Sequence, residues 1–162
     1  MNQKYFKKGE FISVYTDTDD QFAVGCVLTA DKTHIVLQTL TPSAEQEGLT
    51  LYRLEDIVKI ERNTLYQNKL IQQFENRQQP LAKYEPPQRD LMQWLFQQAQ
   101  AQNKIVQVQL QLSGHCDVQG YVAFWDNDVC TIRQVDDYGR ADGEVMFLWS
   151  DITSIKVTDR EE

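Results

Sequence analysis

Two histidines and three cysteines are the residues of this chain best suited to metal binding or nucleophilic chemistry. His115 and Cys116 are adjacent, and the others, His34, Cys26 and Cys130, stand singly. Their spacing is not that of a zinc site, and no C-x-x-C pair occurs. Cys26 and Cys130 occupy ordinary positions in apolar runs. The sequence therefore predicts no metal site and no cofactor.

Two acidic stretches, 17–20 (DTDD) and 126–128 (DND), could be taken for cation-binding loops. Neither has the glycine and the distant glutamate of an EF-hand. Asp and Asn favour tight turns, because their side chains accept hydrogen bonds from nearby backbone N–H groups. We interpret both stretches as turns. The chain also lacks a G-x-S-x-G sequence and a phosphate-binding loop, and neither histidine has a partner in sequence, so we expect no enzymatic activity.

Aromatic residues concentrate between positions 121 and 149. An exposed ring can stack on a nucleic-acid base or anchor a protein interface. Alternation along 120–125 cannot place every ring inside, so we expect one or two of Tyr121, Trp125 and Trp149 to be exposed, with most other rings in the core.

Basic residues are the second candidate for binding. Lys59 and Arg62 would contribute to one basic surface if folding brings them near the N-terminal lysines, Lys4, Lys7 and Lys8. The net charge of −8 is unevenly distributed, with −3 over residues 1–63, +1 over 64–103 and −6 over 104–162. An acidic surface repels the phosphate backbone of nucleic acids, which counts against such a partner.

No apolar run approaches the roughly 20 residues needed to cross a bilayer. The N-terminus is basic but lacks the apolar stretch of a secretory signal. The odd number of cysteines does not indicate a disulfide framework. We expect a cytoplasmic protein without a membrane partner.

The elements that must position these residues come from a segment of sequence that occurs twice in the chain. A shift of 95 residues aligns 25–62 with 120–157 without a gap, and one inserted residue extends the match upstream. Identical pairs fall at glycines, turn aspartates and apolar positions: Gly25/Gly120, Val27/Val122, Asp31/Asp126, Gly48/Gly143, Asp56/Asp151, Ile57/Ile152 and Ile60/Ile155. These are positions that a fold constrains, so the pattern indicates an internal duplication.

Each copy is predicted to form five short strands. The first copy has them at 11–15, 21–29, 34–40, 49–53 and 57–62, and the second at 105–112, 116–125, 129–135, 144–149 and 152–157. The connection between the last two strands is too short for a hairpin loop and suits a 3₁₀ turn. Gly25 and Gly120 in the long second strands would ease the curvature of a small closed barrel.

Residues 64–103 have a different composition, rich in glutamine and containing Pro80, Pro86 and Pro87. Thr64 is a plausible N-cap for a helix with an apolar stripe of Tyr66, Leu70, Ile71 and Phe74. Asp90 could cap a second helix with a stripe of Leu91, Trp94, Leu95 and Ala99. The predicted organisation is a first barrel at 1–63, a helix and proline-containing linker at 64–89, and a helix with the second barrel at 90–162.

This order of elements resembles the Sm-like fold, and most closely that of the bacterial RNA chaperone Hfq. The segment GYVAFWD (120–126) matches the family's Gly-x-hydrophobic-x-x-aromatic-Asp pattern, and DITSI (151–155) matches its closing strand. Gly25-Cys-Val27, Asp31 and Asp56-Ile57 carry the match in the first copy. The resemblance implies two tandem Sm-like (SH3-like) β-barrels joined by a helical linker.

The family's binding residues are not matched. Thr33 and Asp128 stand where Sm-like proteins present an aromatic ring after the turn. The family's binding residues just before the last strand are also replaced, by Leu148, Trp149 and Ser150 in one copy and by Arg53, Leu54 and Glu55 in the other. The resemblance implies an RNA-associated, non-enzymatic regulator. The alternative is a protein–protein interaction or assembly module without nucleic acid. We also expect the two barrels to pack on each other, and homo-oligomers are compatible with the family.

Overall fold

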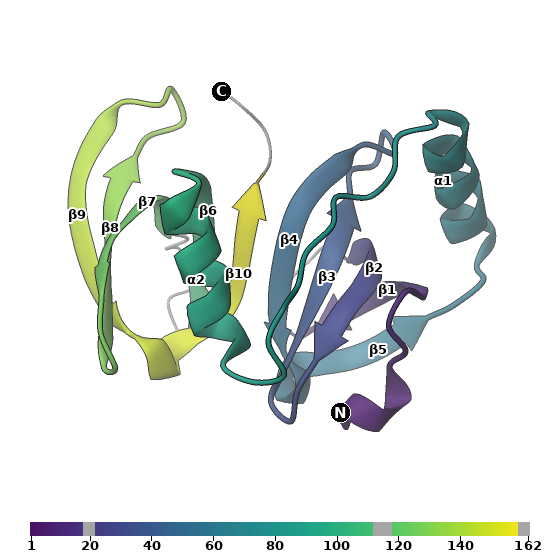
Figure 1. The fold of residues 1–162 in the computed structure, drawn as a ribbon, viewed down its shortest axis with the longest axis horizontal. Helices are drawn as coiled ribbons and strands as arrows, with labels where there is room; N and C mark the ends of the chain where they lie inside the picture. Colours follow the sequence, from purple (N-terminus) through teal and green to yellow (C-terminus); the bar gives the residue numbers. More distant parts are fainter. Residues whose placement is uncertain (18–21, 112–117, 159–162) are drawn as a thin grey trace. The chain divides into compact units, whose positions relative to one another are not determined.

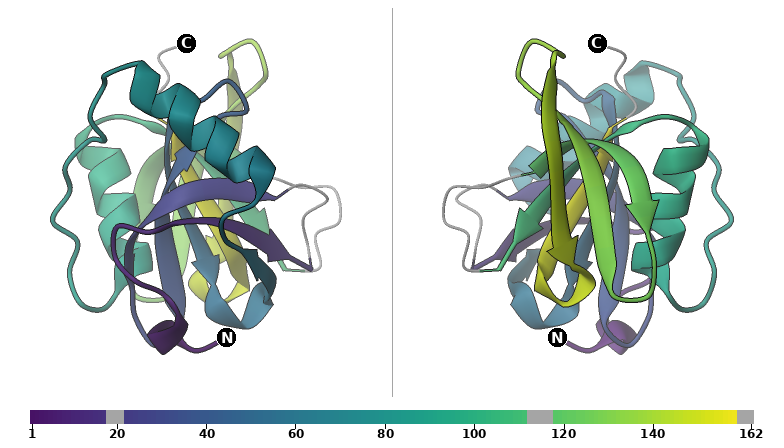
Figure 2. Two further views of the ribbon diagram at one scale, coloured as in Figure 1. Left: turned by 90° about the vertical axis from the view of Figure 1, so that its right-hand side faces the viewer. Right: turned by 90° about the vertical axis from the view of Figure 1, so that its left-hand side faces the viewer.

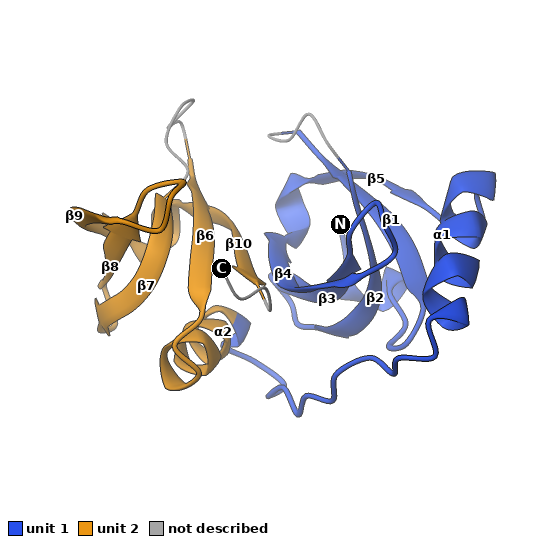
Figure 3. Ribbon diagram, turned by 90° about the horizontal axis from the view of Figure 1, so that it is seen from above, with its two compact units in different colours: residues 1–91 blue, residues 92–162 orange. Residues whose placement is uncertain are grey.

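The structure is a computed structural model that describes residues 1–17, 22–111 and 118–158. Over these ranges the chain is mainly β, with ten antiparallel strands, two α-helices and three 3₁₀ turns (Figure 1). It divides into two compact units, residues 1–91 and 92–162 (Figure 3). The first unit therefore includes residues 64–89, which the sequence predicts as a separate helix and proline-containing linker. Residues 18–20 of the first acidic stretch, His115 and Cys116 lie outside the described residues.

Unit 1 contains five strands in the order β5-β1-β2-β3-β4. Their bounds are β1 Phe11–Thr16, β2 Ala23–Ala30, β3 His34–Leu40, β4 Gln46–Arg53 and β5 Ile57–Glu61. A short 3₁₀ turn, η1 (Gln3–Tyr5), precedes them, and η2 (Leu54–Asp56) separates β4 from β5. The strands lie close to the predicted ranges, and the 3₁₀ break stands where the short connection had indicated one.

Unit 2 repeats this order as β10-β6-β7-β8-β9. Its strands are β6 Ile105–Leu110, β7 Val118–Trp125, β8 Val129–Val135, β9 Ala141–Leu148 and β10 Ile152–Thr158, with η3 (Trp149–Asp151) before the last. β5 is the first strand in the order of unit 1 and β9 is the last in the order of unit 2, and among the described residues no strand pairs with the outer edge of either. In the right-hand view of Figure 2, β9 is the yellow-green strand in front.

The pairing register recurs between the units at the shift of 95 residues. Val27 lies opposite Leu37, and Val122 lies opposite Ile132. Each register then shifts, after Val27 and after Val122, as expected for a β-bulge that adds one residue to one strand. The two halves therefore share one pattern of strand pairing as well as one pattern of sequence.

The two aligned glycines allow close approach of the neighbouring strand. A Cβ on Gly25 would lie 2.6 Å from the carbonyl oxygen of Gln38, and a Cβ on Gly120 would overlap the carbonyl oxygen of Arg133. Gln38 and Arg133 are themselves related by 95 residues. Any side chain at either glycine would push the paired strand away, which explains why glycine stands at both positions.

The main core of unit 1 draws on all five strands and on η2. Its buried members are Ile12, Val14, Val27, Ile35, Leu37, Tyr52, Leu54 and Ile57. One cluster can join the first and last strands of the order only if the sheet curves around it, as unit 1 does in Figure 3. Among the described residues β4 and β5 are not paired with each other, so hydrogen bonds do not close the predicted barrel.

Helix α1 (Leu65–Asn76) covers a second core cluster of unit 1. Thr64 is its N-cap, and the hydroxyl oxygen accepts a hydrogen bond from the backbone N–H of Gln67 at 3.1 Å. Leu70 and Phe74 pack on Val24, Leu40 and Ala44. The predicted stripe is wrong at Tyr66, which is 48% exposed, because Gln67 is buried in its place. Nε2 of the Gln67 amide donates a hydrogen bond to the carbonyl oxygen of Phe11, which offsets the cost of burying this nitrogen.

Helix α2 (Leu91–Ala101) begins where predicted. Asp90 has a φ of 57°, so its backbone is left-handed rather than extended as in a usual N-cap. Leu95, Phe96 and Ala99 are buried, whereas Trp94 is only half-buried. Over the described residues, neither helix has the length and apolar character needed to cross a membrane.

Candidate functional site

Two of the three rings expected as binding residues are packed inside unit 2. Trp149 is 7% exposed, its indole N–H donates to the carbonyl oxygen of Asp126 at 2.7 Å, and its ring meets Phe96 of α2 edge to face. Trp125 is half-buried against Trp149, and its Nε1 donates to Oε1 of Gln100 at 3.3 Å. Trp149 is therefore a core residue, and Trp125 packs against it while part of its surface stays exposed.

Tyr121 lies on the outer face of β7 and is half-buried. It stands opposite Ile105 on one side and Arg133 on the other. Of the three predicted rings, Tyr121 is the one that the structure leaves on an outer sheet face.

The two predicted basic residues are both engaged with carboxylates. Arg62 donates from Nε and Nη2 to the carboxylate of Glu10, at 3.1 and 3.0 Å, and from Nη2 to the carbonyl oxygen of Tyr5. Its guanidinium holds the pKa of Glu10 below the ordinary value. The ammonium of Lys59 lies 3.9 Å from Glu61 and 4.0 Å from the ring centre of Tyr15. These contacts reduce the positive charge that either residue could offer to a phosphate.

The most exposed apolar surface of unit 2 consists of Phe124, Met146 and Leu148, which we call the β9 patch. Their exposed fractions are 54%, 64% and 48%. Phe124 and Met146 both lie opposite Thr131, and Leu148 lies opposite Val129. Because residues two apart on a strand share a face, these side chains form one outer surface over β7, β8 and β9.

The bulge in β7 explains why sequence alternation did not find this patch. Strict alternation from the buried Val122 would turn Phe124 inward and Trp125 outward. The extra residue between Val122 and Phe124 reverses this phase, so Phe124 pairs with Thr131 on the outer face and Trp125 pairs with the buried Cys130. The sequence carries no signal for this bulge, which the structure shows at the equivalent position of both halves.

Carboxylates stand at both ends of the β9 patch. Asp128 is exposed, and its carbonyl oxygen accepts from the backbone N–H of Trp149, which follows Leu148. Backbone N–H groups of Asp128 and Val129 donate to the Asp126 side chain and lower the pKa of Asp126, which keeps this carboxylate ionised. At the other end Glu144 and Asp142 are exposed, with Arg133 opposite Glu144.

A second aromatic surface lies on unit 1, formed by rings that the sequence pattern does not indicate as binding residues. Tyr15 and Phe22 stack with ring centres 5.0 Å apart, and Phe22 meets Tyr66 edge to face at 5.6 Å. Phe22 is 38% exposed and Tyr66 is 48% exposed. A hydrogen bond to Glu61 raises the pKa of Tyr15. We call these three rings the Tyr15 cluster.

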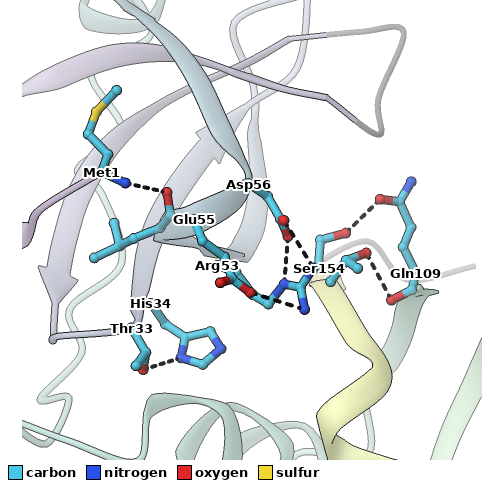
Figure 4. A network of polar contacts seen from close by, with 10 residues as sticks. Met1, Thr33, His34, Arg53, Glu55, Asp56, Gln109 and Ser154 are labelled. Atoms are coloured by element: carbon cyan, nitrogen blue, oxygen red, sulfur yellow. Dashed lines mark hydrogen bonds and ion pairs between the residues drawn. The ribbon is translucent and has the colours of Figure 1, made fainter. Parts of the chain in front are cut away.

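A polar network in unit 1 surrounds the start of β3 and η2 (Figure 4). Arg53 donates from Nε and Nη2 to the two carboxylate oxygens of Asp56, at 2.6 and 2.9 Å. Nδ1 of His34 lies 2.7 Å from the hydroxyl of Thr33, and Nε2 is buried without a hydrogen-bond partner. Burial lowers the pKa of His34.

The aligned positions of unit 2 do not repeat this network. Asp128, Val129 and Leu148 stand where unit 1 has Thr33, His34 and Arg53. The network therefore stabilises one copy of the turn rather than forming a site common to both halves.

Cys26 and Cys130 are buried, and burial raises the pKa of Cys130 to about 12, so its thiol stays protonated. Within the described part of the chain, no group of three or more His, Cys, Asp or Glu side chains could hold a metal ion. His115 and Cys116 lie outside that part.

Comparison of the chain with protein-family models, with curated proteins and with solved structures finds no match.

Proposed function

We propose that this chain is a non-enzymatic binding protein with two Sm-like halves, and that its partner is another protein. The observation that carries the proposal is the β9 patch, where three large apolar side chains are exposed together beside an unpaired strand edge. Contiguous apolar surface of this kind is typical of interaction sites, whereas single exposed apolar residues are common.

The assignment of Sm-like halves draws support from their shared local structure. Each half has the strand order β5-β1-β2-β3-β4 or its equivalent, an Asp turn after the second strand, and a 3₁₀ turn before the last strand. In both turns the Asp side chain accepts from two following backbone N–H groups. These features match the resemblance, while the packing of Trp149 and the ion pairing of Lys59 and Arg62 favour the protein-binding alternative over RNA.

Site-specific photo-crosslinking in cells tests the class of partner. A photoreactive phenylalanine analogue replaces Met146, and a matched control carries it at Leu65, which is 91% exposed on unit 1. We expect adducts at position 146 that protease removes and nuclease leaves intact, and none at position 65. Adducts removed by nuclease, or equal adducts at both positions, would contradict a protein partner at the β9 patch.

RNA is a second candidate, favoured by the Tyr15 cluster. Exposed rings can stack on bases, and Lys59 lies beside them. In that case the nuclease-sensitive adducts would arise from an analogue at Tyr66 rather than at Met146.

A further inference from the structure

We infer that the partner binds the β9 patch as an extended, basic segment that adds one strand to the outer edge of β9. This inference rests on the proposed function and specifies its partner. The added strand would place alternate apolar side chains beside Met146 and Leu148 and lysine or arginine side chains at the ends of the patch.

The outer edge of β9 is open over a stretch that carries no protection against pairing. Natural edge strands are blunted by charges, prolines, bulges or short length. Residues 145–148 (VMFL) contain no charge, proline or glycine. Since β9 stands at the end of the strand order, the outward backbone N–H and C=O groups of these residues have no partner strand in the described chain.

The first half of β9 is protected, which limits where a strand can add. Asp142 and Glu144 are exposed, and Gly143 has a φ of 78° beside a register shift between Arg133 and Val135. These are the devices that discourage pairing. The open segment is therefore 145–148, on which the apolar side chains of the patch stand.

Strand β5 of unit 1 also has an unpaired outer edge among the described residues, but it differs from β9 in length and in charge. It has five residues against eight in β9, and it carries Lys59 and Glu61 in contact with each other. A short strand with charges on its exposed face is a poor template for an added strand. Both strands have an exposed edge, so the feature that distinguishes β9 from β5 is its uncharged stretch at 145–148.

Charge selects a basic occupant over a second copy of the same edge. The ends of the patch carry exposed Asp126, Asp128, Asp142 and Glu144, with Arg133 as the basic residue opposite Glu144. Residues 104–162 carry a net charge of −6. Pairing of β9 with β9 of a second copy would bring these carboxylates together, whereas a basic segment would be attracted to them. Backbone pairing would then supply affinity, and the alternate side chains specificity.

Peptide binding to the intact chain tests the inference. The probe is an acetylated, fluorescent peptide as long as β9, eight residues, in which valine alternates with threonine between terminal lysines. One control peptide has glutamate for lysine, and another has proline for a central threonine, which removes a strand N–H donor without changing charge. We expect the lysine peptide to bind about tenfold more tightly than either control.

Protein variants and hydrogen exchange locate the binding. Met146→Ser should weaken the lysine peptide about tenfold by removing apolar contact area, and Leu65→Ser should leave it unchanged. Amide protection on binding should be confined to residues 145–148. Equal binding of the three peptides, an unaffected Met146→Ser variant, or protection elsewhere would overturn the inference, as would absence of binding.

The outcomes separate the inference from the proposed function. Polypeptide crosslinks at position 146 without peptide binding would overturn the basic strand and leave the protein-binding function intact. Sedimentation showing a dimer that Met146→Ser dissociates would identify a second copy as the occupant and likewise overturn the inference. Absence of polypeptide crosslinks at position 146 would overturn both the inference and the proposed function.

Discussion

At the scale of single residues, Trp125 joins α2 to the core of unit 2. Its indole donates to Gln100 and its ring contacts Trp149. We expect Trp125→Ala to lower the free energy of unfolding by about 2 kcal/mol, less than a fully buried tryptophan because Trp125 is half-buried. Chemical denaturation monitored by circular dichroism measures this change.

Tyr138→Ala is the matched control, since Tyr138 is 84% exposed and should change stability by less than about 0.5 kcal/mol. Equal, small effects of both substitutions would show that Trp125 is not a packing residue. Trp125 would then again be a candidate binding residue.

We expect His34 to make the free energy of unfolding depend on pH below about 6.5. Burial lowers the pKa of His34, and Arg53 acts in the same direction, while the nearby carboxylates Asp31, Glu55 and Asp56 oppose it. The unfolded state, with a pKa of about 6.5, therefore binds a proton more readily than the folded state. This contribution is fully present above pH 6.5 or so and is lost as the pH falls toward the lower folded-state pKa.

Replacement of the ring tests this assignment. In His34→Gln the decrease of unfolding free energy between about pH 7.5 and pH 5.5 should be smaller than in the unsubstituted chain. Urea titrations at a series of pH values give the comparison. Parallel curves for the two proteins would show that His34 does not cause the dependence.

At the scale of elements, the strand pairs β2–β3 and β7–β8 depend on glycine where the backbones approach. Gly25→Ala and Gly120→Ala each place a methyl group against a carbonyl oxygen of the next strand. We expect each to destabilise the protein by about 2 kcal/mol or more, with the larger effect at Gly120, where the overlap is greater. Thermal unfolding compares the two variants directly.

Gly143→Asn serves as the control for these glycines. A Cβ at Gly143 meets nothing within 4 Å, and Asn tolerates its φ of 78° better than other residues do. Its effect should be below about 1 kcal/mol. If Gly143→Asn were as destabilising as Gly120→Ala, the backbone conformation of each glycine, rather than close strand approach, would be enough to explain the effect.

Sequence patterns located most elements because local chemistry determines them. Alternating apolar residues predicted the strands, Asp31 and Asp126 predicted their turns, and Thr64 predicted the start of α1. The sequence also points to Gly25 and Gly120, but as residues that ease curvature. The structure shows them where neighbouring strands approach closely, and among the described residues no hydrogen bonds between β4 and β5 close the predicted barrel.

The candidate site was not predictable in the same way, because it depends on pairing between strands. A bulge after Val122 turns Phe124 to the outer face of the sheet and Trp125 to the inner face, and no residue type in β7 predicts this bulge. The openness of β9 depends on which strand lies at the end of the order, and the ion pairs of Arg62 and Lys59 depend on contacts with Glu10 and Glu61. Each of these is a tertiary feature.

At the scale of the whole molecule, the net charge favours the proposed protein partner over nucleic acid. The chain carries 16 basic and 24 acidic residues, a net charge of −8. Most non-specific affinity for nucleic acid comes from neutralising phosphates with lysine and arginine, and this chain engages Lys59 and Arg62 with carboxylates of its own. A protein partner with basic segments, in contrast, would be attracted to the same surface.

Retention on RNA homopolymers at two salt concentrations measures this balance for the intact chain. We expect no retention at about 0.15 M salt and at most weak retention at lower salt, because the acidic surface opposes phosphate contacts. Tyr66→Ala, which removes an exposed ring of the Tyr15 cluster, should then have no effect. Tight retention that falls steeply with salt and is lost in Tyr66→Ala would favour RNA, since stacking and phosphate contacts would both be required. In that case the Tyr15 cluster, rather than the β9 patch, would be the principal binding surface of the molecule.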